Sequence, residues 1–177
     1  MKLGKIIISK EQIQSKVKEI AQQIKEDYKD KSLSIICVLK GAIFFLNDLV
    51  KYLTDMDVIN IDVDYIKVKS YENTKSTGKI DFKKDITINV KDKEVLIVED
   101  IIDTNLTIKY LIDYFLNEKG AKRVKVCTFL NKLVEKKFDY TPTYLGYEIE
   151  DIFVVGYGLD CNDKYRLEEN IFECIED

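Results

Sequence analysis

The chain has 177 residues, of which 28 are basic, 32 are acidic and none is histidine, so its formal net charge is −4. This length predicts one domain with a substantial core, and the acidic balance argues against general binding to nucleic acid or anionic membranes. The missing histidine excludes Ser–His–Asp and Cys–His catalysis and leaves acid–base chemistry to Asp, Glu, Lys or Tyr. A bound metal should then be a hard ion with oxygen ligands, which favours Mg²⁺.

The cysteines and the opening residues bear on the cellular compartment. Four cysteines are scattered without a CxxC pair, namely Cys37, Cys127, Cys161 and Cys174. This pattern is typical of buried thiols in a reducing compartment and does not support a structural zinc site. The opening "MKLGKIIISKEQIQ" lacks the apolar core of a signal peptide, and no apolar run is long enough to span a bilayer. We therefore expect a cytoplasmic protein with no membrane partner.

The first predicted elements are an amphipathic helix and a buried strand. Ser9 followed by Gln12 forms a capping-box pattern, and apolar residues follow at helical spacing: Ile13, Val17, Ile20, Ala21 and Ile24. The all-apolar stretch 33–39 predicts a strand buried on both faces of a parallel sheet. It leads through Lys40 and Gly41 into a second predicted helix, "AIFFLNDLVKYL".

Next come a half-buried strand and a long polar stretch. Residues 58–68 alternate polar and apolar side chains, as a strand with one solvated face does. Residues 69–85, "KSYENTKSTGKIDFKKD", keep no steady period. A polar loop of this length in a compact domain is usually mobile or functional.

The second half of the chain alternates strands and one helix. Strands are predicted at 94–99, 123–130, 143–149 and 153–159. The helix between the first two carries an apolar stripe and should end near Gly120; the stripe is Ile108, Leu111, Ile112, Phe115 and Leu116. Apolar strands that alternate with helices predict a single α/β domain with a mainly parallel sheet.

Three carboxylates, Glu99, Asp100 and Asp103, follow the apolar run at 95–98. Ligands of parallel α/β sheets bind beyond the carboxyl ends of the strands, which is where these side chains should lie. Spacing alone allows a plainer interpretation, in which Asp103 caps the next helix and the other two are solvated.

The residues after the carboxylates suit a phosphate. The segment "DTNLT" (103–107) opens a helix, and the backbone N–H groups there, with the hydroxyls of Thr104 and Thr107, can cradle an anion. Asn105 tolerates a left-handed conformation. A cradle beside carboxylates fits a ligand with both a phosphate and hydroxyls, such as a ribose phosphate, and Mg²⁺ could offset the remaining negative charge.

The segment "VLIVEDIIDTNLT" (95–107) resembles the phosphoribosyl-pyrophosphate signature of bacterial hypoxanthine-guanine phosphoribosyltransferases, whose usual form is "VLIVEDIIDTGLT". Four further blocks resemble this family in the same order: "VLKGAIFFLNDL" (38–49), "VKSYENTKSTG" (68–78), "CTFLNK" (127–132) and "FVVGYGLDCNDKYR" (153–166). Together the blocks cover essentially the whole chain.

The resemblance implies a type I phosphoribosyltransferase fold in a single domain, 1–177. This fold has a mainly parallel twisted sheet flanked by helices, a small hood subdomain and a mobile lid loop, here 69–85 with Ser70 and Tyr71 at its start. The implied reaction transfers a phosphoribosyl group from phosphoribosyl pyrophosphate to N9 of a 6-oxopurine in purine salvage. The resemblance also implies Mg²⁺ as cofactor, a homo-oligomer (dimer or tetramer) and no nucleic-acid partner.

The resemblance assigns the phosphoribosyl pyrophosphate contacts to several segments. Lys40 and Gly41 would form the pyrophosphate loop, where the family tends to have a cis peptide before the lysine, and Arg166 would also bind pyrophosphate. Glu99 and Asp100 would hold the ribose hydroxyls, directly or through Mg²⁺. The 5′-phosphate cradle would be Asp103, Thr104, Asn105, Leu106 and Thr107. Asp103 would also lie near N7 of the base, as general base or as a charge that stabilises the transition state.

The resemblance places the purine between the later strands. Lys132 would donate to the exocyclic O6, Phe153 would stack on the base, and Val154 would offer backbone groups to its edge. Asp160, beside the purine, would help to place Mg²⁺ with the two strand-end carboxylates. Without the resemblance, a lysine after a strand is usually solvated, and an aromatic residue that opens a strand is usually core.

Two departures from the family pattern bear on donor affinity and base preference. Asn105 stands where the family usually has glycine, and Asn131 stands where bacterial relatives commonly have aspartate, followed by "LVEKKF" without the usual proline. A regulator that senses phosphoribosyl pyrophosphate is the main alternative, but it should show a basic face or an appended binding domain. A receiver-like signalling domain needs acidic residues near its first strand, which "LSIICVLKG" lacks.

Overall fold

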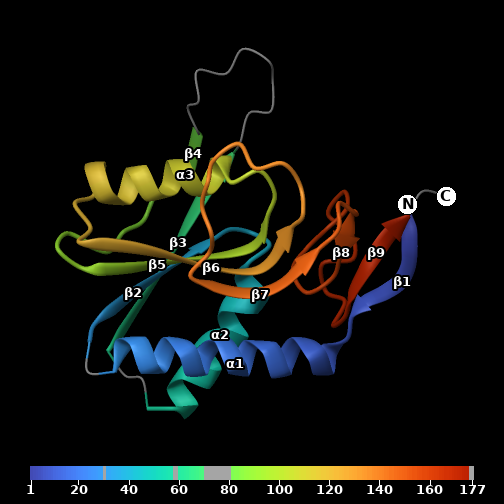
Figure 1. Cartoon of the computed structure of the whole chain (residues 1–177), viewed down its shortest axis with the longest axis horizontal. Coiled ribbons are helices and arrows are strands. Elements are labelled where there is room, and N and C mark those ends of the chain that lie inside the picture. Colours follow the sequence, from blue (N-terminus) through green and yellow to red (C-terminus); the bar gives the residue numbers. More distant parts are fainter. Residues whose placement is uncertain (30, 58–59, 70–80, 176–177) are drawn as a thin grey trace.

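A six-stranded sheet forms the centre of the computed structural model, which describes residues 1–29, 31–57, 60–69 and 81–175 (Figure 1). Its strand order is β4-β3-β2-β5-β6-β7, and all neighbours pair in parallel except β3 and β4, which are antiparallel. The strands are β2 (Leu33–Val38), β3 (Ile61–Lys69), β4 (Asp81–Lys84), β5 (Glu94–Ile102), β6 (Arg123–Lys132) and β7 (Tyr144–Ile149). The predicted mainly parallel α/β sheet is confirmed.

Helices cover both faces of this sheet (Figure 1). α1 (Lys10–Tyr28) and α2 (Ile43–Asp55) lie on one face, and α3 (Leu106–Asp113) lies on the other. Apart from Ser34, the sequence of β2 is apolar because both of its faces are buried. Ile35 and Cys37 pack in the cluster with α1 and α2, whereas Ile36 and Val38 pack in the cluster with α3. The capping box of Ser9 and Gln12 is present at the start of α1, and its five predicted apolar residues are buried.

The predicted stripe of α3 is correct only in its first part. Ile108, Leu111 and Phe115 are buried, but Leu116 is 39% exposed. After Asp113 the chain makes a π-helical turn, η1 (Tyr114–Glu118), whose wider turn breaks the 3.6-residue spacing on which the prediction relied. Gly120, with φ +68°, follows this turn, close to the predicted end.

A second, smaller sheet lies beyond the carboxyl ends of the main strands (Figure 1). Its antiparallel strands are β1 (Lys2–Ile8), β9 (Ile171–Ile175) and β8 (Val154–Val155), in that order. The predicted strand at 153–159 is therefore too long. The backbone leaves the extended conformation directly after Val155, because Gly156, Tyr157 and Gly158 all have positive φ.

The expected lid at 69–85 is described only at its ends. Ser70 and Tyr71 lie outside the described residues. Lys69 still belongs to β3, and β4 (residues 81–84) pairs antiparallel with β3, so these residues are strand and not loop. Phe82 of β4 packs against the ring of Tyr114, with ring centroids 4.4 Å apart, an aromatic contact that local periodicity does not reveal.

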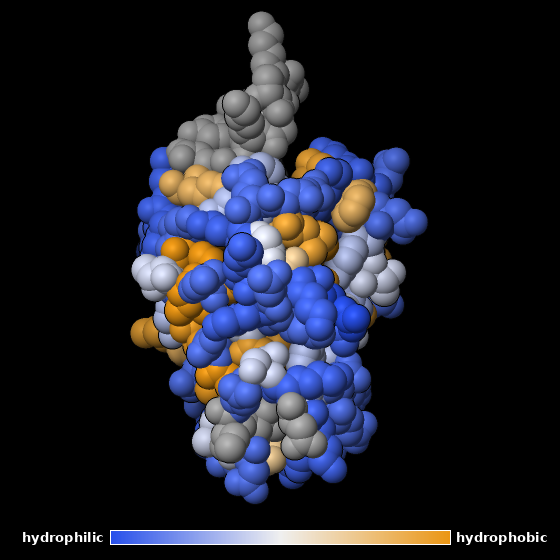
Figure 2. Space-filling view, turned by 90° about the vertical axis from the view of Figure 1, so that its left-hand side faces the viewer, coloured by the Kyte–Doolittle hydropathy of each residue, from blue (hydrophilic) through white to orange (hydrophobic). Residues whose placement is uncertain are grey.

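The surface and the cysteines agree with the composition. The face at the left of Figure 1 is covered mostly by hydrophilic residues, with scattered hydrophobic ones between them (Figure 2). Across the described ranges, no helix has both the length and the apolar character to cross a membrane. Cys37, Cys127, Cys161 and Cys174 are all buried.

Candidate active site

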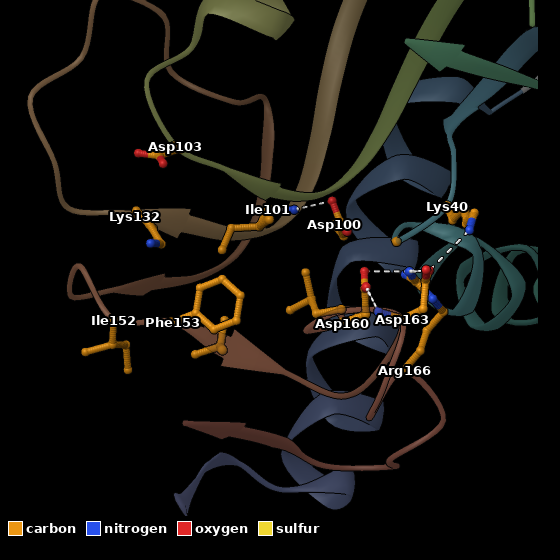
Figure 3. A pocket seen from close by; sticks show the side chains of 13 residues that line it. Lys40, Asp100, Ile101, Asp103, Lys132, Ile152, Phe153, Asp160, Asp163 and Arg166 are labelled. Atoms are coloured by element: carbon orange, nitrogen blue, oxygen red, sulfur yellow. Dashed lines mark hydrogen bonds and ion pairs between the residues drawn. The ribbon is translucent and has the colours of Figure 1, made fainter. Parts of the chain in front are cut away.

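A pocket of about 400 Å³ opens between the carboxyl ends of β5 and β6 and the smaller sheet (Figure 3). It brings together nine predicted residues from distant segments: Lys40, Gly41, Asp100, Asp103, Lys132, Phe153, Val154, Asp160 and Arg166. Figure 3 shows two ends, with Asp103, Lys132 and Phe153 at one and Lys40 and Arg166 at the other. Asp100 lies between them, at the end of β5.

Two adjacent carboxylates lie at the middle of this site. The side chain of Glu99 is buried, with 8% of the residue exposed, and Asp100 lines the pocket beside it. Burial raises the pKa of Glu99 well above its ordinary value, and the negative charge of Asp100 raises it further. Burial also raises the pKa of Asp100. Hydrogen bonds with Glu99 and with the backbone N–H of Ile101, and then the guanidinium of Arg166, offset this rise only in part. Both carboxylates would be stabilised by a cation or by hydroxyl donors.

The donor set fits Mg²⁺ with substrate oxygens. Carboxylate oxygens are its preferred protein ligands, and Mg²⁺ commonly takes one or two carboxylates together with water and substrate phosphate. In the described ranges, no group of three or more Asp, Glu, Cys or His side chains could hold a metal ion unaided. The third predicted ligand, Asp160, accepts hydrogen bonds from Arg166 at 2.5 Å and from the backbone N–H of Asp163 at 2.8 Å.

The loop after β2 lies tightly against Asp100. The peptide between Leu39 and Lys40 is cis, as the resemblance implies. A Cβ atom added to Gly41 would lie 1.5 Å from Oδ2 of Asp100, and one added to Gly158 would lie 2.0 Å from the carbonyl oxygen of Gly41. The backbone of this loop can therefore approach the carboxylate only because residue 41 is glycine.

Charged side chains of opposite sign form the end of the pocket near this loop. Nζ of Lys40 lies 3.4 Å from Oδ1 of Asp163, and Arg166 lies 3.8 Å from the same atom. Arg166 also donates to the carbonyl oxygen of Gly158. Asn162 and Asp163 have positive φ, so this end is built from irregular backbone. Two cations held by exchangeable partners suit an incoming polyanion.

The other end of the pocket combines a lysine with an aromatic ring. Lys132 is the last residue of β6, and its Nζ donates to Asp151 at 2.9 Å while only 14% of its side chain is exposed. Phe153 is 50% exposed although it lines a pocket, so the core interpretation of this residue is wrong. Val154 is buried in β8. A flat polar ring between Phe153 and Lys132 would meet both.

The predicted phosphate loop, 103–107, begins α3. Asn105 has φ +68° and ψ 0°, a left-handed conformation of the kind that asparagine tolerates. Thr104 and Thr107 are half-buried, and Leu106 is 47% exposed. Of these residues only Asp103 lines the described pocket, so the loop lies beside it.

Sequence reasoning missed several residues of the pocket wall. Ile101, Ile152 and Leu159 form apolar parts of the wall, and their apolar character alone does not distinguish them from core. Asp163 also lines the pocket; two nearby predicted cations need counter-charges, a signal that could have indicated it. Asp151, the partner of Lys132, is 68% exposed at its side chain and left no signal.

Comparisons with known proteins identify the family to which the chain belongs. Residues 7–162 match the phosphoribosyl transferase domain family. The chain is 41% identical to the hypoxanthine-guanine phosphoribosyltransferase of Bacillus subtilis over 165 residues, 93% of this chain and 89% of that one. It is 40% identical over the same length to the hypoxanthine-guanine-xanthine phosphoribosyltransferase of Tritrichomonas foetus, which covers 93% of this chain and 87% of that one.

A solved structure extends the agreement to the fold. The crystal structure of a hypoxanthine-guanine phosphoribosyltransferase from Bacillus anthracis matches with a TM-score of 0.91 at 40% identity, covering 98% of this chain and all of the other. The chain therefore belongs to the phosphoribosyltransferase family. Within that family its similarity is to the hypoxanthine-guanine phosphoribosyltransferases, as its sequence motifs predicted, and the regulator alternative gains no support.

Proposed function

We propose that the protein transfers the phosphoribosyl group of phosphoribosyl pyrophosphate to N9 of hypoxanthine or guanine in purine salvage. The observation that carries this proposal is one pocket with two cations at one end, a lysine and an exposed ring at the other, and a buried carboxylate pair between them. That order matches the order of pyrophosphate, ribose and base along the reacting substrates.

The phosphoribosyl pyrophosphate molecule spans the middle and one end of the pocket. Lys40 and Arg166 exchange their carboxylate partners for pyrophosphate oxygens. Glu99 and Asp100 accept hydrogen bonds from the 2′- and 3′-hydroxyls, and the backbone N–H groups of residues 103–107 bind the 5′-phosphate. Glu99 and Asp100 would hold Mg²⁺, and the ion would supply positive charge beside the pyrophosphate. We infer that Asp160 acts here mainly by orienting Arg166.

The purine lies at the other end. Lys132 donates to O6, Phe153 stacks on the ring, and the backbone of Val154 meets its edge. Adenine is disfavoured, because its 6-amino group is a donor that would face the ammonium donor of Lys132. The relatives' names differ in whether xanthine is included, and that choice is made at position 2 of the base.

The chemical step breaks the bond between C1′ and a pyrophosphate oxygen, and the electron pair leaves with pyrophosphate. N9 of the purine forms the new bond to C1′, and the ring loses a proton. Asp103, at the purine end, accepts this proton or stabilises the positive charge that develops. Closure of the lid at 69–85 with Ser70 and Tyr71 would exclude water, which otherwise captures the ribose.

A steady-state assay tests the proposal. Phosphoribosyl pyrophosphate, Mg²⁺ and each of hypoxanthine, guanine, xanthine and adenine are supplied, and nucleotide formation is followed by absorbance. We expect turnover with hypoxanthine and guanine and none with adenine. Binding of phosphoribosyl pyrophosphate without nucleotide formation from any base would contradict the proposal. Gel filtration of the same sample tests the inferred homo-oligomer, and a cytoplasmic location agrees with four buried cysteine thiols.

A further inference from the structure

The connection between β6 and β7 lies against the predicted phosphate loop, 103–107. We name residues 136–140 of this connection the strap; it is part of the orange loop beside α3 in Figure 1. Nζ of Lys136 donates to the carbonyl oxygen of Asp103, and the backbone N–H of Lys137 donates to the carbonyl oxygen of Thr104 at 3.0 Å. The strap thus contacts two successive residues of the loop.

Asn105 continues this row of contacts with its side chain. Its Nδ2 donates to the carbonyl oxygen of Phe138 at 2.7 Å and to that of Tyr140 at 2.9 Å. The residue is 2% exposed, and its Oδ1 is buried without a hydrogen-bond partner among the described residues. The two donated bonds therefore decide the orientation of the amide, because the flipped amide would set Oδ1 against two carbonyl oxygens.

The strap is itself fixed to the end of β6. Nζ of Lys136 also donates to Oδ1 of Asn131 and to the carbonyl oxygen of Lys132, each at 2.8 Å. The rings of Phe138 and Tyr140 are stacked with centroids 6.3 Å apart. Asn105 thus binds to a braced segment. Both departures from the family pattern, Asn105 and Asn131 with the changed segment after Lys132, meet in this one assembly.

We propose that Asn105 is a positioning residue that holds the 103–107 loop against the strap and so preorganises the backbone N–H groups for the 5′-phosphate. Glycine at this position would adopt the same left-handed backbone but could not donate to the strap. The inference rests on the proposed function, because it assumes that this loop binds the phosphate. It assigns Asn105 an indirect role, in which its amide contacts protein carbonyls and not the substrate.

The test uses Asn105→Gly in the full-length protein. Glycine keeps the positive φ and removes both donated hydrogen bonds, so backbone strain does not confuse the result. Binding of inosine 5′-monophosphate and of inosine is compared by calorimetry, since the two ligands differ only in the phosphate. We expect Asn105→Gly to weaken binding of the nucleotide about tenfold, because two neutral hydrogen bonds are lost, and to leave binding of inosine unchanged. The KM for phosphoribosyl pyrophosphate should rise by a similar factor, and more than kcat falls.

Two further variants make the result specific. Asn60→Gly is the matched control, because Asn60 also donates its amide, to Ser32 at 2.8 Å, at the opposite end of the strands. It should bind both ligands as the unchanged protein does. Asn105→Asp keeps the shape of the side chain but sets a carboxylate against two carbonyl oxygens. It should therefore weaken binding of the nucleotide more than Asn105→Gly does.

The outcomes separate this inference from the proposed function. If the unchanged protein binds nucleotide no more tightly than inosine, the phosphate-loop assignment itself fails. If it prefers the nucleotide but Asn105→Gly has the same preference, the positioning role of Asn105 is overturned. Equal weakening of both ligands, with a lower melting temperature, would show a merely structural residue and would also overturn it.

Discussion

Asp64 on β3 and the Glu99–Asp100 pair on β5 are carboxylate sites in one sheet, but their surroundings differ. Asp64 is 6% exposed and accepts hydrogen bonds from the backbone N–H groups of Tyr65, Thr87 and Ile88, at 2.5–3.0 Å. It also accepts one from the hydroxyl of Thr87 at 3.0 Å. Glu99 and Asp100 lie against each other, and the N–H of Ile101 donates to Asp100 at 2.8 Å.

The pKa values of the two sites move in opposite directions. Burial alone would raise the pKa of Asp64, but the hydrogen bonds from Thr87, Tyr65 and Ile88 outweigh it and hold the pKa well below the ordinary value. Burial and mutual repulsion raise the pKa of Glu99. The comparison separates a structural carboxylate, whose hydrogen bonds are supplied by the fold, from a pair that a ligand must complete.

Asp103→Asn should have the largest effect on turnover. Asp103 is exposed and belongs to neither buried site, so its replacement should leave stability unchanged. Loss of a general base or a transition-state charge should lower kcat by roughly 10²–10⁴-fold while phosphoribosyl pyrophosphate still binds. Asp113→Asn, at an exposed aspartate paired with Lys109 at 2.7 Å, is the control. Near-normal kcat in Asp103→Asn would refute its catalytic role.

Gly41→Ala should disturb the Glu99–Asp100 pair, because Gly41 packs directly against Asp100. The added Cβ would lie 1.5 Å from Oδ2 of Asp100, so the carboxylate or the loop must move. A displacement of about 1 Å in an active site can lower turnover about a hundredfold, and we expect a loss of this order. Gly4→Ala is the matched control, because its Cβ would meet Glu173 only at 3.1 Å, in the smaller sheet. Unchanged kcat/KM in Gly41→Ala would contradict the close packing.

Glu99→Gln should weaken binding of phosphoribosyl pyrophosphate with Mg²⁺ by about tenfold to a hundredfold, since a charged acceptor is lost. It should also stabilise the unliganded protein. Because the pKa of Glu99 is raised in the folded protein, its contribution to folding stability is fully present below the ordinary pKa of Glu. This contribution is lost as pH rises through the raised value. Urea unfolding at pH 5 and pH 8 should therefore show a smaller fall in stability for Glu99→Gln. An equal fall in both proteins would contradict the raised pKa.

Asp64→Asn should have the smallest effect on turnover. It should destabilise the protein, whereas Glu99→Gln should stabilise it. Removal of the charged acceptor should lower the free energy of unfolding by about 1–3 kcal/mol at pH 7, with kcat per folded molecule unchanged. Since the folded pKa is depressed, Asp64 stabilises the protein above its ordinary pKa, and this contribution is lost as pH falls through the folded value.

The control for this substitution is Asp62→Asn, on the same strand, whose carboxylate is exposed and pairs with Lys93 at 2.8 Å. It should have little effect on stability. If Asp64→Asn is no less stable than Asp62→Asn at pH 7, the structural role of Asp64 is wrong.

Local patterns predicted the parts of the fold whose causes are local. The capping box at Ser9, the doubly buried β2 and the left-handed Asn105 follow from residues within a few positions of each other. The motif at 95–107 also indicated where the carboxylates meet the pocket.

Features that depend on distant partners could not be predicted in this way. The smaller sheet pairs β1 with β9 from opposite ends of the chain, and β4 is held by rings on α3 and η1. The donors to Asp64 come from residues 65, 87 and 88, and the carbonyl oxygens that accept hydrogen bonds from Asn105 lie at 138 and 140. No periodicity within one segment encodes such contacts.

The strand order has a consequence for redesign. From the centre of the sheet, β2 is followed outward by β3 and β4 on one side, and β5 by β6 and β7 on the other. Of the proposed purine contacts, Lys132 ends β6 on the second side and Phe153 directly precedes β8 of the smaller sheet, whereas Lys40 follows β2. Exchanging residues 128–155 with those of a relative of different base preference should therefore transfer that preference as a module, leaving the pyrophosphate half of the enzyme intact.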